Sequence, residues 1–196
     1  MPETMRRLRQ HHDNLSRLLT ALERQVVEME RGDKADWDIV RRIVEYCLAY
    51  PDLHHHPLED RVFARLRSKD PAAATPFIGL ESEHRELSVS LRRVAAATDQ
   101  VLQDATVPRD WFTSLFRKFL DVQRDHIRRE ESGFYPAAER VLATADWADL
   151  DRSASGLPDD PLFDRPANRQ YLALLSDIEA WEAAEPRGSG PDGARL

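Results

Sequence analysis

Apolar residues recur at intervals of three and four over most of the chain, with charged side chains between them. This spacing is typical of amphipathic α-helices, because positions three, four and seven apart share one helix face. The first such stripe predicts a helix over roughly residues 3–30 and consists of Leu8, Leu15, Leu18, Leu19, Leu22, Val26 and Met29. Gly32 is placed to end this helix and Asp36 to cap the next one.

The second predicted helix begins near Trp37 and extends to about Leu66, with two prolines inside it. Pro51 and Pro57 each lack an amide proton, and each ring clashes with the carbonyl four residues earlier. We therefore expect one helix with a kink or a local π-type widening at this point. The alternative is a helix that stops near Tyr50 and another that begins at Pro57.

Two further helices complete the pattern. Thr75 and Pro76 suit the N-cap and the first position of a third helix, which extends to Val101. Pro108 opens a fourth helix that extends to Val141. Four long helices with short connections predict an all-α fold, an up-down-up-down four-helix bundle.

The composition changes beyond the fourth helix. Residues 151–168 are rich in proline, glycine and aspartate, and an apolar stripe then predicts a short C-terminal helix from Tyr171 to Trp181. We divide the chain into a bundle domain over residues 1–148, a C-terminal excursion with a short helix packed on the bundle over 149–185, and a disordered tail over 186–196. A homodimer through the short helix is compatible with this pattern.

Charge and cysteine content exclude several classes of function. The formal net charge is −7, and no clustered basic excess marks a nucleic-acid-binding surface. Cys47 is the only cysteine, which excludes an internal disulfide and any cysteine-based metal site within one chain. Both Cys47 and Trp111 lie on apolar stripes and are assigned to the core. Because no signal-peptide pattern and no run of about 20 apolar residues occurs, we expect a soluble, cytoplasmic protein that does not enter a membrane.

Two histidine–glutamate pairs in the sequence have the spacing of metal ligands on a helix. His55 precedes Glu59 by four residues, and His126 precedes Glu130 by the same interval. On a helix, such positions lie on one face with Cβ atoms roughly 5–6 Å apart, so an imidazole and a carboxylate can converge on one ion. The alternative is that the three consecutive histidines at 54–56 form only an exposed polar turn.

A single histidine precedes each pair at nearly the same interval. His12 lies 43 residues before His55, and His84 lies 42 residues before His126, so the chain repeats one unit with a period of about 71 residues. Six residues in two matched halves predict a metal site on the inward faces of four helices. The predicted ligands are His12, His55, Glu59, His84, His126 and Glu130.

The ligand set defines which metals fit. Imidazole nitrogens and carboxylate oxygens suit iron, manganese or zinc, but not Cu(I) or iron–sulfur clusters. Six ligands cannot fill two octahedral shells, so positions remain open for water, an oxo bridge or a diatomic ligand. Two alternatives stay open, His11 in place of His12 and Glu131 in place of Glu130. Candidate acceptors for the outer imidazole N–H groups are Glu81, Asp52 and Asp125.

Over about residues 5–143 the chain resembles the hemerythrin-like HHE cation-binding family. The matching stretches are Asn14-Leu15 after His12, the run Tyr50-Pro-Asp-Leu-His-His-His-Pro-Leu-Glu-Asp, the pair Glu83-His84, His126-Ile-Arg-Arg-Glu-Glu, and Phe134-Tyr135-Pro136. The resemblance implies a four-helix bundle with a non-haem di-iron centre, bridged by oxo or hydroxo, that binds oxygen or nitric oxide. It also implies that the six residues above are the ligands, with two iron ions as the cofactor and manganese or zinc as other ions that fit.

One position departs from the oxygen-carrying hemerythrins. Those proteins have a His-x-x-x-His pair on the third helix, whereas Leu80 stands four residues before His84 here. One iron therefore lacks a nitrogen ligand, which disfavours simple reversible oxygen carriage. The resulting symmetric pattern resembles the iron–sulfur-cluster repair proteins of the same superfamily.

Three functional hypotheses follow, in order of preference. The first is a di-iron protein that binds oxygen or nitric oxide for sensing, storage or scavenging. The second is a di-iron oxidoreductase acting on peroxide, nitric oxide or damaged iron–sulfur centres. The third is a helical bundle in which the metal only stabilises the fold. Binding is preferred because no general acid, nucleophile or redox cysteine stands beside the ligands, and the sequence does not decide whether the protein is an enzyme.

Overall fold

The computed structural model describes residues 1–103, 105–164 and 167–184. Every regular element in these ranges is a helix, so the all-α prediction is confirmed. In chain order the elements are α1 (Glu3–Arg31), α2 (Trp37–Ala49), the π-helix Pro51–His55, α3 (His56–Lys69), α4 (Pro71–Ala74), the 3₁₀ turn Thr75–Phe77, α5 (Leu80–Leu102), α6 (Arg109–Arg129), the π-helix Glu130–Phe134, α7 (Tyr135–Val141), α8 (Thr144–Ala154), the 3₁₀ turn Arg169–Tyr171 and α9 (Leu172–Ala184).

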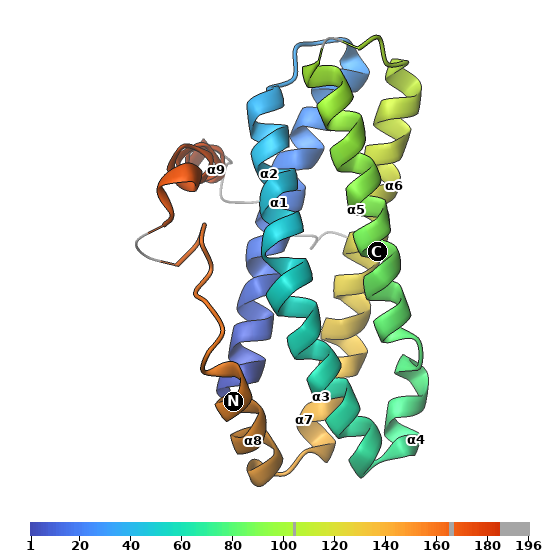
Figure 1. The fold of residues 1–196 in the computed structure, drawn as a ribbon, viewed down its shortest axis with the longest axis vertical. Coiled ribbons are helices and arrows are strands. Elements are labelled where there is room, and N and C mark those ends of the chain that lie inside the picture. The colour runs from blue at the N-terminus through green and yellow to red at the C-terminus, as the bar shows by residue number, and fades with distance from the viewer. Residues whose placement is uncertain (104, 165–166, 185–196) are drawn as a thin grey trace, which may run out of the picture.

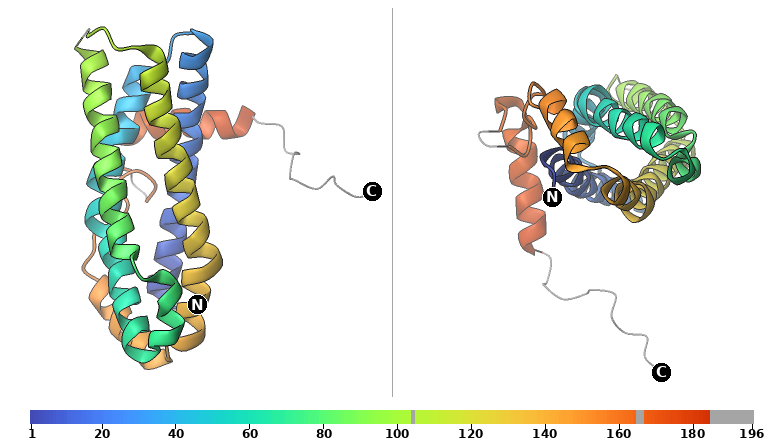
Figure 2. Two further views of the ribbon diagram at one scale, coloured as in Figure 1. Left: turned by 90° about the vertical axis from the view of Figure 1, so that its right-hand side faces the viewer. Right: turned by 90° about the horizontal axis from the view of Figure 1, so that it is seen from below.

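The long helices lie side by side along the longest dimension of the molecule (Figure 1). Helix α1 packs against α2 and α6, and α5 also packs against α2 and α6. Seen along its length, the molecule is a ring of helices with α9 outside it (Figure 2). Because each long helix has two neighbours of this kind, its apolar stripe faces a common interior.

The start of the chain follows the predicted pattern closely. Helix α1 ends at Gly32, whose φ of 85° is in the left-handed region that favours glycine. The Asp36 side chain accepts hydrogen bonds from the backbone N–H groups of Asp38 and Ile39 and so caps α2. A glycine and a capping aspartate therefore define the two ends of the loop between α1 and α2.

The second predicted helix is continuous through its prolines but widens, as expected. Residues Pro51–His55 form a π-helix between α2 and α3. The wider turn accommodates the hydrogen bond that Pro51 cannot donate, and Pro57 lies in the first turn of α3, directly after this wider turn. A second π-helix, Glu130–Phe134, interrupts the fourth helix, about eight residues later in the repeat than the first one. Both irregular turns contain or adjoin predicted ligands.

The predicted start of the third helix at Thr75 is wrong. Residues Thr75–Phe77 form a 3₁₀ turn, and α5 begins only at Leu80. The Thr75 hydroxyl donates to the carbonyl of Pro71 rather than accepting from a helix N–H. Gly79, with φ of 108°, reverses the chain immediately before α5, a backbone conformation that hydrophobic periodicity does not report.

The C-terminal region contains one helix that was not predicted. Helix α8 crosses residue 148, the proposed end of the bundle domain, and the Asp151 carboxylate accepts from the Thr4 backbone and hydroxyl at 2.7 and 2.6 Å. Helix α9 agrees with the predicted short helix and packs on α1 and α2, with Leu174 and Ile178 in the core. The predicted tail over 186–196 lies outside the described residues.

The core assignments are only partly correct. Cys47 is 3% exposed, as predicted, but Trp111 is 52% exposed and lies on the surface near the start of α6. The buried apolar residues form two clusters. One contains Leu15, Ile43 and Phe116, and the other contains Phe63 and Phe134. No helix in the described ranges combines the length and apolarity that crossing a membrane requires.

Asp160 joins the segment between α8 and α9 to helices α1 and α2. Its side chain is buried and accepts hydrogen bonds from Asn14 Nδ2 at 3.0 Å and from the Tyr46 hydroxyl at 2.8 Å. It also accepts from the backbone N–H groups of Leu162 and Phe163. One carboxylate thus joins α1, α2 and the C-terminal segment.

We predict that Asp160→Ala lowers the free energy of unfolding by about 3 kcal/mol, because buried donors on Asn14 and Tyr46 would lose their acceptor. Urea unfolding followed by circular dichroism measures the change. Asp159→Ala, at an exposed neighbouring position, is the matched control and should change stability by less than about 0.5 kcal/mol. Equal effects of the two substitutions would contradict this account of the anchor.

Candidate metal centre

The six predicted ligands come from all four long helical segments and meet in the interior. His12 lies on α1, His84 on α5, and the other four on the two interrupted segments. Their exposed fractions range from 0 to 5%. Sequence periodicity therefore placed all six on inward faces, and the structure brings their polar atoms together.

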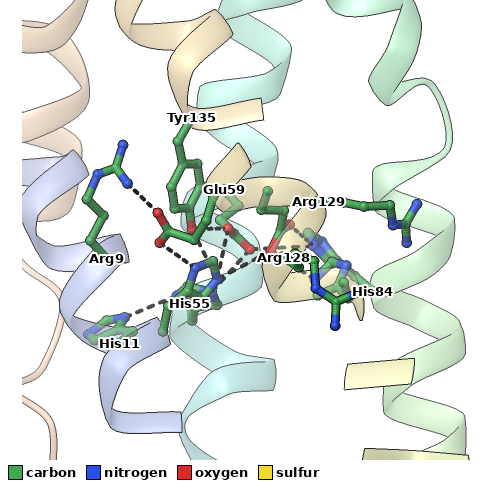
Figure 3. Close-up of polar contacts among 12 residues, drawn as sticks. Arg9, His11, His55, Glu59, His84, Arg128, Arg129 and Tyr135 are labelled. Atoms are coloured by element: carbon green, nitrogen blue, oxygen red, sulfur yellow. Dashed lines mark hydrogen bonds and ion pairs between the residues drawn. The ribbon is translucent and has the colours of Figure 1, made fainter. Parts of the chain in front are cut away.

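Glu59 faces imidazoles from both halves of the repeat. Its Oε2 lies 3.2 Å from His55 Nε2 and 3.5 Å from His84 Nε2, and its Oε1 lies 3.7 Å from His12 Nε2. Figure 3 shows Glu59 and His55 converging with Tyr135 between the helices. A carboxylate with nitrogens on several sides is arranged as a bridging group.

Glu130 occupies the equivalent position in the second half. Its Oε2 lies 3.2 Å from His126 Nε2 and 3.3 Å from His12 Nε2, and its Oε1 lies 3.4 Å from His84 Nε2. Each of the two carboxylates therefore contacts histidines from both halves. The two halves of the sequence repeat therefore meet at these two glutamates.

The contacts of His12 distinguish Glu130 from Glu131, its alternative as a predicted ligand. The Nε2 atom of His12 faces Glu59 and Glu130, and its Nδ1 lies 2.9 Å from Glu131 Oε1. Glu131 also forms an ion pair with Arg9. Glu130 thus points inward, whereas Glu131 lies behind His12 as an outer partner.

His11 points to the outer side of His55. The two Nδ1 atoms are 3.2 Å apart, and His11 Nε2 lies 2.9 Å from the Tyr50 hydroxyl. If His55 Nε2 faces a metal, its Nδ1 must carry the proton and donate it to His11. His11 then supports His55 rather than the centre itself.

Acidic partners stand behind the ligands of the second half. His84 Nδ1 lies 3.0 Å from Asp60 Oδ1, whereas His126 Nδ1 lies 3.5 Å from Glu83 Oε2 and forms no hydrogen bond with it. A hydrogen-bonded carboxylate such as Asp60 fixes the tautomer that leaves the inner nitrogen free for a metal. The arrangement matches that of histidines in metal sites.

The predicted outer acceptors are wrong in two cases. Asp125 pairs with Arg128 on the surface, and Glu81 is exposed. Asp52 does face an imidazole, at 3.5 Å, but that imidazole belongs to His56. The true partners come from other turns and other helices, which spacing within one helix does not reveal.

Sequence reasoning missed two residues of the centre. His56 is 6% exposed, and one of its nitrogens lies within 4.8 Å of ligand atoms of Glu59, His84 and His126. Tyr135 is fully buried, donates a hydrogen bond to Glu59 and has its hydroxyl 3.2 Å from His12 Nε2. The available signal was the unbroken run of histidines for the first, and the position of Tyr135 five residues after Glu130 for the second.

Several atoms of the cluster lack hydrogen-bond partners. Among the described residues, Glu59 Oε2, Glu130 Oε2, His56 Nε2 and both ring nitrogens of His126 are fully buried without one. A buried polar atom left in this state costs about 1–3 kcal/mol, and charged groups cost more. Cations held by these atoms would remove that cost, so the residues fit a metal.

The electrostatics of the cluster also fit cations. Burial would raise the pKa of Glu59, but the facing imidazoles of His55, His12 and His84 hold it well below its usual range. Burial opposes protonation of His12 and His84, yet their hydrogen bonds to the surrounding carboxylates raise their pKa to about 9 and about 10. Burial lowers the pKa of His126 to about 4. Without metal, two protons balance the carboxylates, and metal ions would replace them.

Comparison with known families identifies the class of protein. The family model described as the hemerythrin HHE cation binding domain matches residues 4–138. This match covers more than half of the chain, and the chain therefore belongs to the hemerythrin HHE cation-binding domain family. A search of curated proteins finds no match. Metal binding by the histidine and glutamate cluster agrees with the family description.

We predict that the metal-free protein is most stable near pH 6.5 and loses stability as the pH rises to about 9–10. The folded-state pKa values of His12 and His84 are raised above the ordinary 6.5, so their contribution is complete below pH 6.5 and disappears as they deprotonate. Stability also falls below pH 6.5, because His126 resists protonation when folded.

Urea unfolding of chelator-treated protein across this pH range measures the effect. The matched comparison is metal-loaded protein, whose alkaline loss should be much smaller because its ligand nitrogens carry no proton. A metal-free protein whose stability stayed constant or rose from pH 6.5 to pH 9 would contradict the assignment of the two protons.

Proposed function

We propose that this chain is a non-haem di-iron protein that binds oxygen or nitric oxide in the cytoplasm, for sensing, storage or scavenging. The ligands in this proposal are His12, His55, Glu59, His84, His126 and Glu130. The observation that carries it is the pair of buried carboxylates, each surrounded by histidine nitrogens from both halves of the chain. Few other arrangements make such burial favourable.

The proposal includes an up-down-up-down bundle over residues 1–148 with the centre at its middle. Its support is the pairwise packing of α1 with α6 and of α2 with α5, together with the short connections between them. In such a bundle, inward residues from four helices meet at one level. Rigid helices then hold the ligands, which is the arrangement that positions a site most accurately.

The donor set suits iron, manganese and zinc. Iron is proposed because the resemblance to the family implies it. When bound, two iron ions would supply open coordination positions and up to two electrons. Around them, Glu59 and Glu130 would hold both ions, and the Tyr135 hydroxyl would donate a hydrogen bond next to His12.

A second candidate function is a di-iron oxidoreductase acting on peroxide, nitric oxide or damaged iron–sulfur centres. The observation in its favour is a cavity of about 440 Å³ that reaches His84 from outside and is lined by polar groups such as Asp52, Asp60, Ser88 and Arg92. Polar walls suit a polar reactant such as peroxide better than a diatomic gas. Turnover with a reductant distinguishes this candidate from reversible binding.

We predict about two iron ions per chain after anaerobic reconstitution, and new absorption bands on exposure to oxygen or nitric oxide. Glu59→Gln should lower bound iron to about one ion or fewer, because it removes a carboxylate that faces three histidines. Glu86→Gln, at an exposed position on α5, is the matched control and should bind iron like the unaltered chain. Metal analysis and absorption spectroscopy measure both.

The outcomes separate the two candidates. Reversal of the spectral change under vacuum supports binding, and consumption of peroxide or nitric oxide over many cycles with a reductant supports the enzyme. Iron content unchanged by Glu59→Gln would contradict the proposed centre. Stable iron binding without any spectral response to oxygen, nitric oxide or peroxide would contradict both functions.

A further inference from the structure

His56 has an inner nitrogen that no other group satisfies. The side chain is 8% exposed, and its Nε2 atom is fully buried without a hydrogen-bond partner. Among the described residues, the other buried side-chain atoms in this condition belong to Glu59, Glu130 and His126, which are predicted ligands. His56 therefore shares the property that marks those residues as metal ligands.

The position of His56 assigns it to one end of the centre. Its nitrogen groups with ligand atoms of Glu59, His84 and His126, whereas His12 and His55 form a separate group with Glu59. The rings of His56 and His84 stack with centroids 4.3 Å apart and planes 11° apart. Glu59 belongs to both groups, which is the position of a bridge between two ions.

The outer side of His56 resembles that of His84. Its Nδ1 lies 3.5 Å from Asp52 Oδ1, and the Ser88 hydroxyl donates to the same oxygen at 2.5 Å. His84 has Asp60 in the same role. An outer carboxylate that is itself held in place sets the tautomer in which Nε2 is free for a metal.

The π-helix explains how adjacent histidines serve different ends of the centre. In an α-helix, consecutive side chains point about 100° apart, so one of two neighbours normally faces away from an interior site. His55 is the last residue of the π-helix and His56 is the first of α3. Both are buried, His55 toward His12 and His56 toward His84.

We propose that His56 is a fifth imidazole ligand and binds the divalent first-row ion held by His84 and His126. This inference rests on the proposed two-ion centre. The ion bound by His56 would then have three imidazole ligands, against two for the ion near His12 and His55. At the His12 end, the Tyr135 hydroxyl donates a hydrogen bond to Glu59.

The test uses the diamagnetic ion zinc and protein labelled with ¹⁵N in its histidine rings. Long-range ¹H–¹⁵N correlation spectra distinguish metal-bound ring nitrogens from free ones, residue by residue. The full chain loaded with zinc should show five metal-bound imidazoles, including His56. His54, which lies two residues earlier and contacts the Tyr50 ring instead, should remain free.

Zinc titration of variants provides a second readout. His56→Ala should weaken one of the two binding steps by at least about tenfold and leave the other step nearly unchanged. His54→Ala is the matched control and should leave both steps as they are. Because the spectrum of the unaltered chain needs no substitution, the test does not depend on the folding of His56→Ala.

Two outcomes would overturn the inference in distinguishable ways. Two bound zinc ions with only four metal-bound imidazoles and a free His56 would contradict the assignment of His56 as a ligand. The proposed six-ligand centre would remain intact. Fewer than two bound zinc ions in the unaltered chain would overturn the two-ion centre and this inference with it.

Discussion

The burial of two carboxylates in the middle of a helical molecule is the constraint on which the rest depends. Glu59 and Glu130 are 0 and 2% exposed, and an unpaired charge in such a place costs several kcal/mol. Their partners are imidazoles from every long helical segment. Two apolar clusters adjoin this polar layer, one containing Leu15 of α1 and the other Leu8 of the same helix. The polar layer therefore sets which helix faces must meet.

Much of this arrangement could be predicted from the sequence, because it depends on spacing within a helix. Intervals of three and four residues gave the helices, and the interval of four gave each histidine–glutamate pair. Prolines indicated the π-helix at Pro51–His55. The start of α5 was mispredicted because Gly79 sets it through backbone conformation. The outer partners Asp60 and Glu83 could not be predicted, because their contacts depend on packing between helices.

The sequence repeat suggested a symmetric centre, but the structure is not symmetric. His12 and His84 are backed by carboxylates, whereas His55 is backed by the imidazole of His11. A neutral acceptor leaves less negative charge on its ligand than a carboxylate does. The polar cavity is lined by His84, at one end of the centre, and not by His12 or His55, at the other end. Two ions bound here would therefore experience different surroundings, which suits a centre that must accept an external ligand at one place.

The most direct test of the central claim is a crystal structure of iron-loaded protein with anomalous scattering measured on both sides of the iron absorption edge. The account predicts two iron peaks in the buried layer, one beside His12 and His55 and the other beside His84 and His126, with Glu59 and Glu130 in contact with both. An anomalous map with no iron in this layer, or with iron only at the surface, would contradict it.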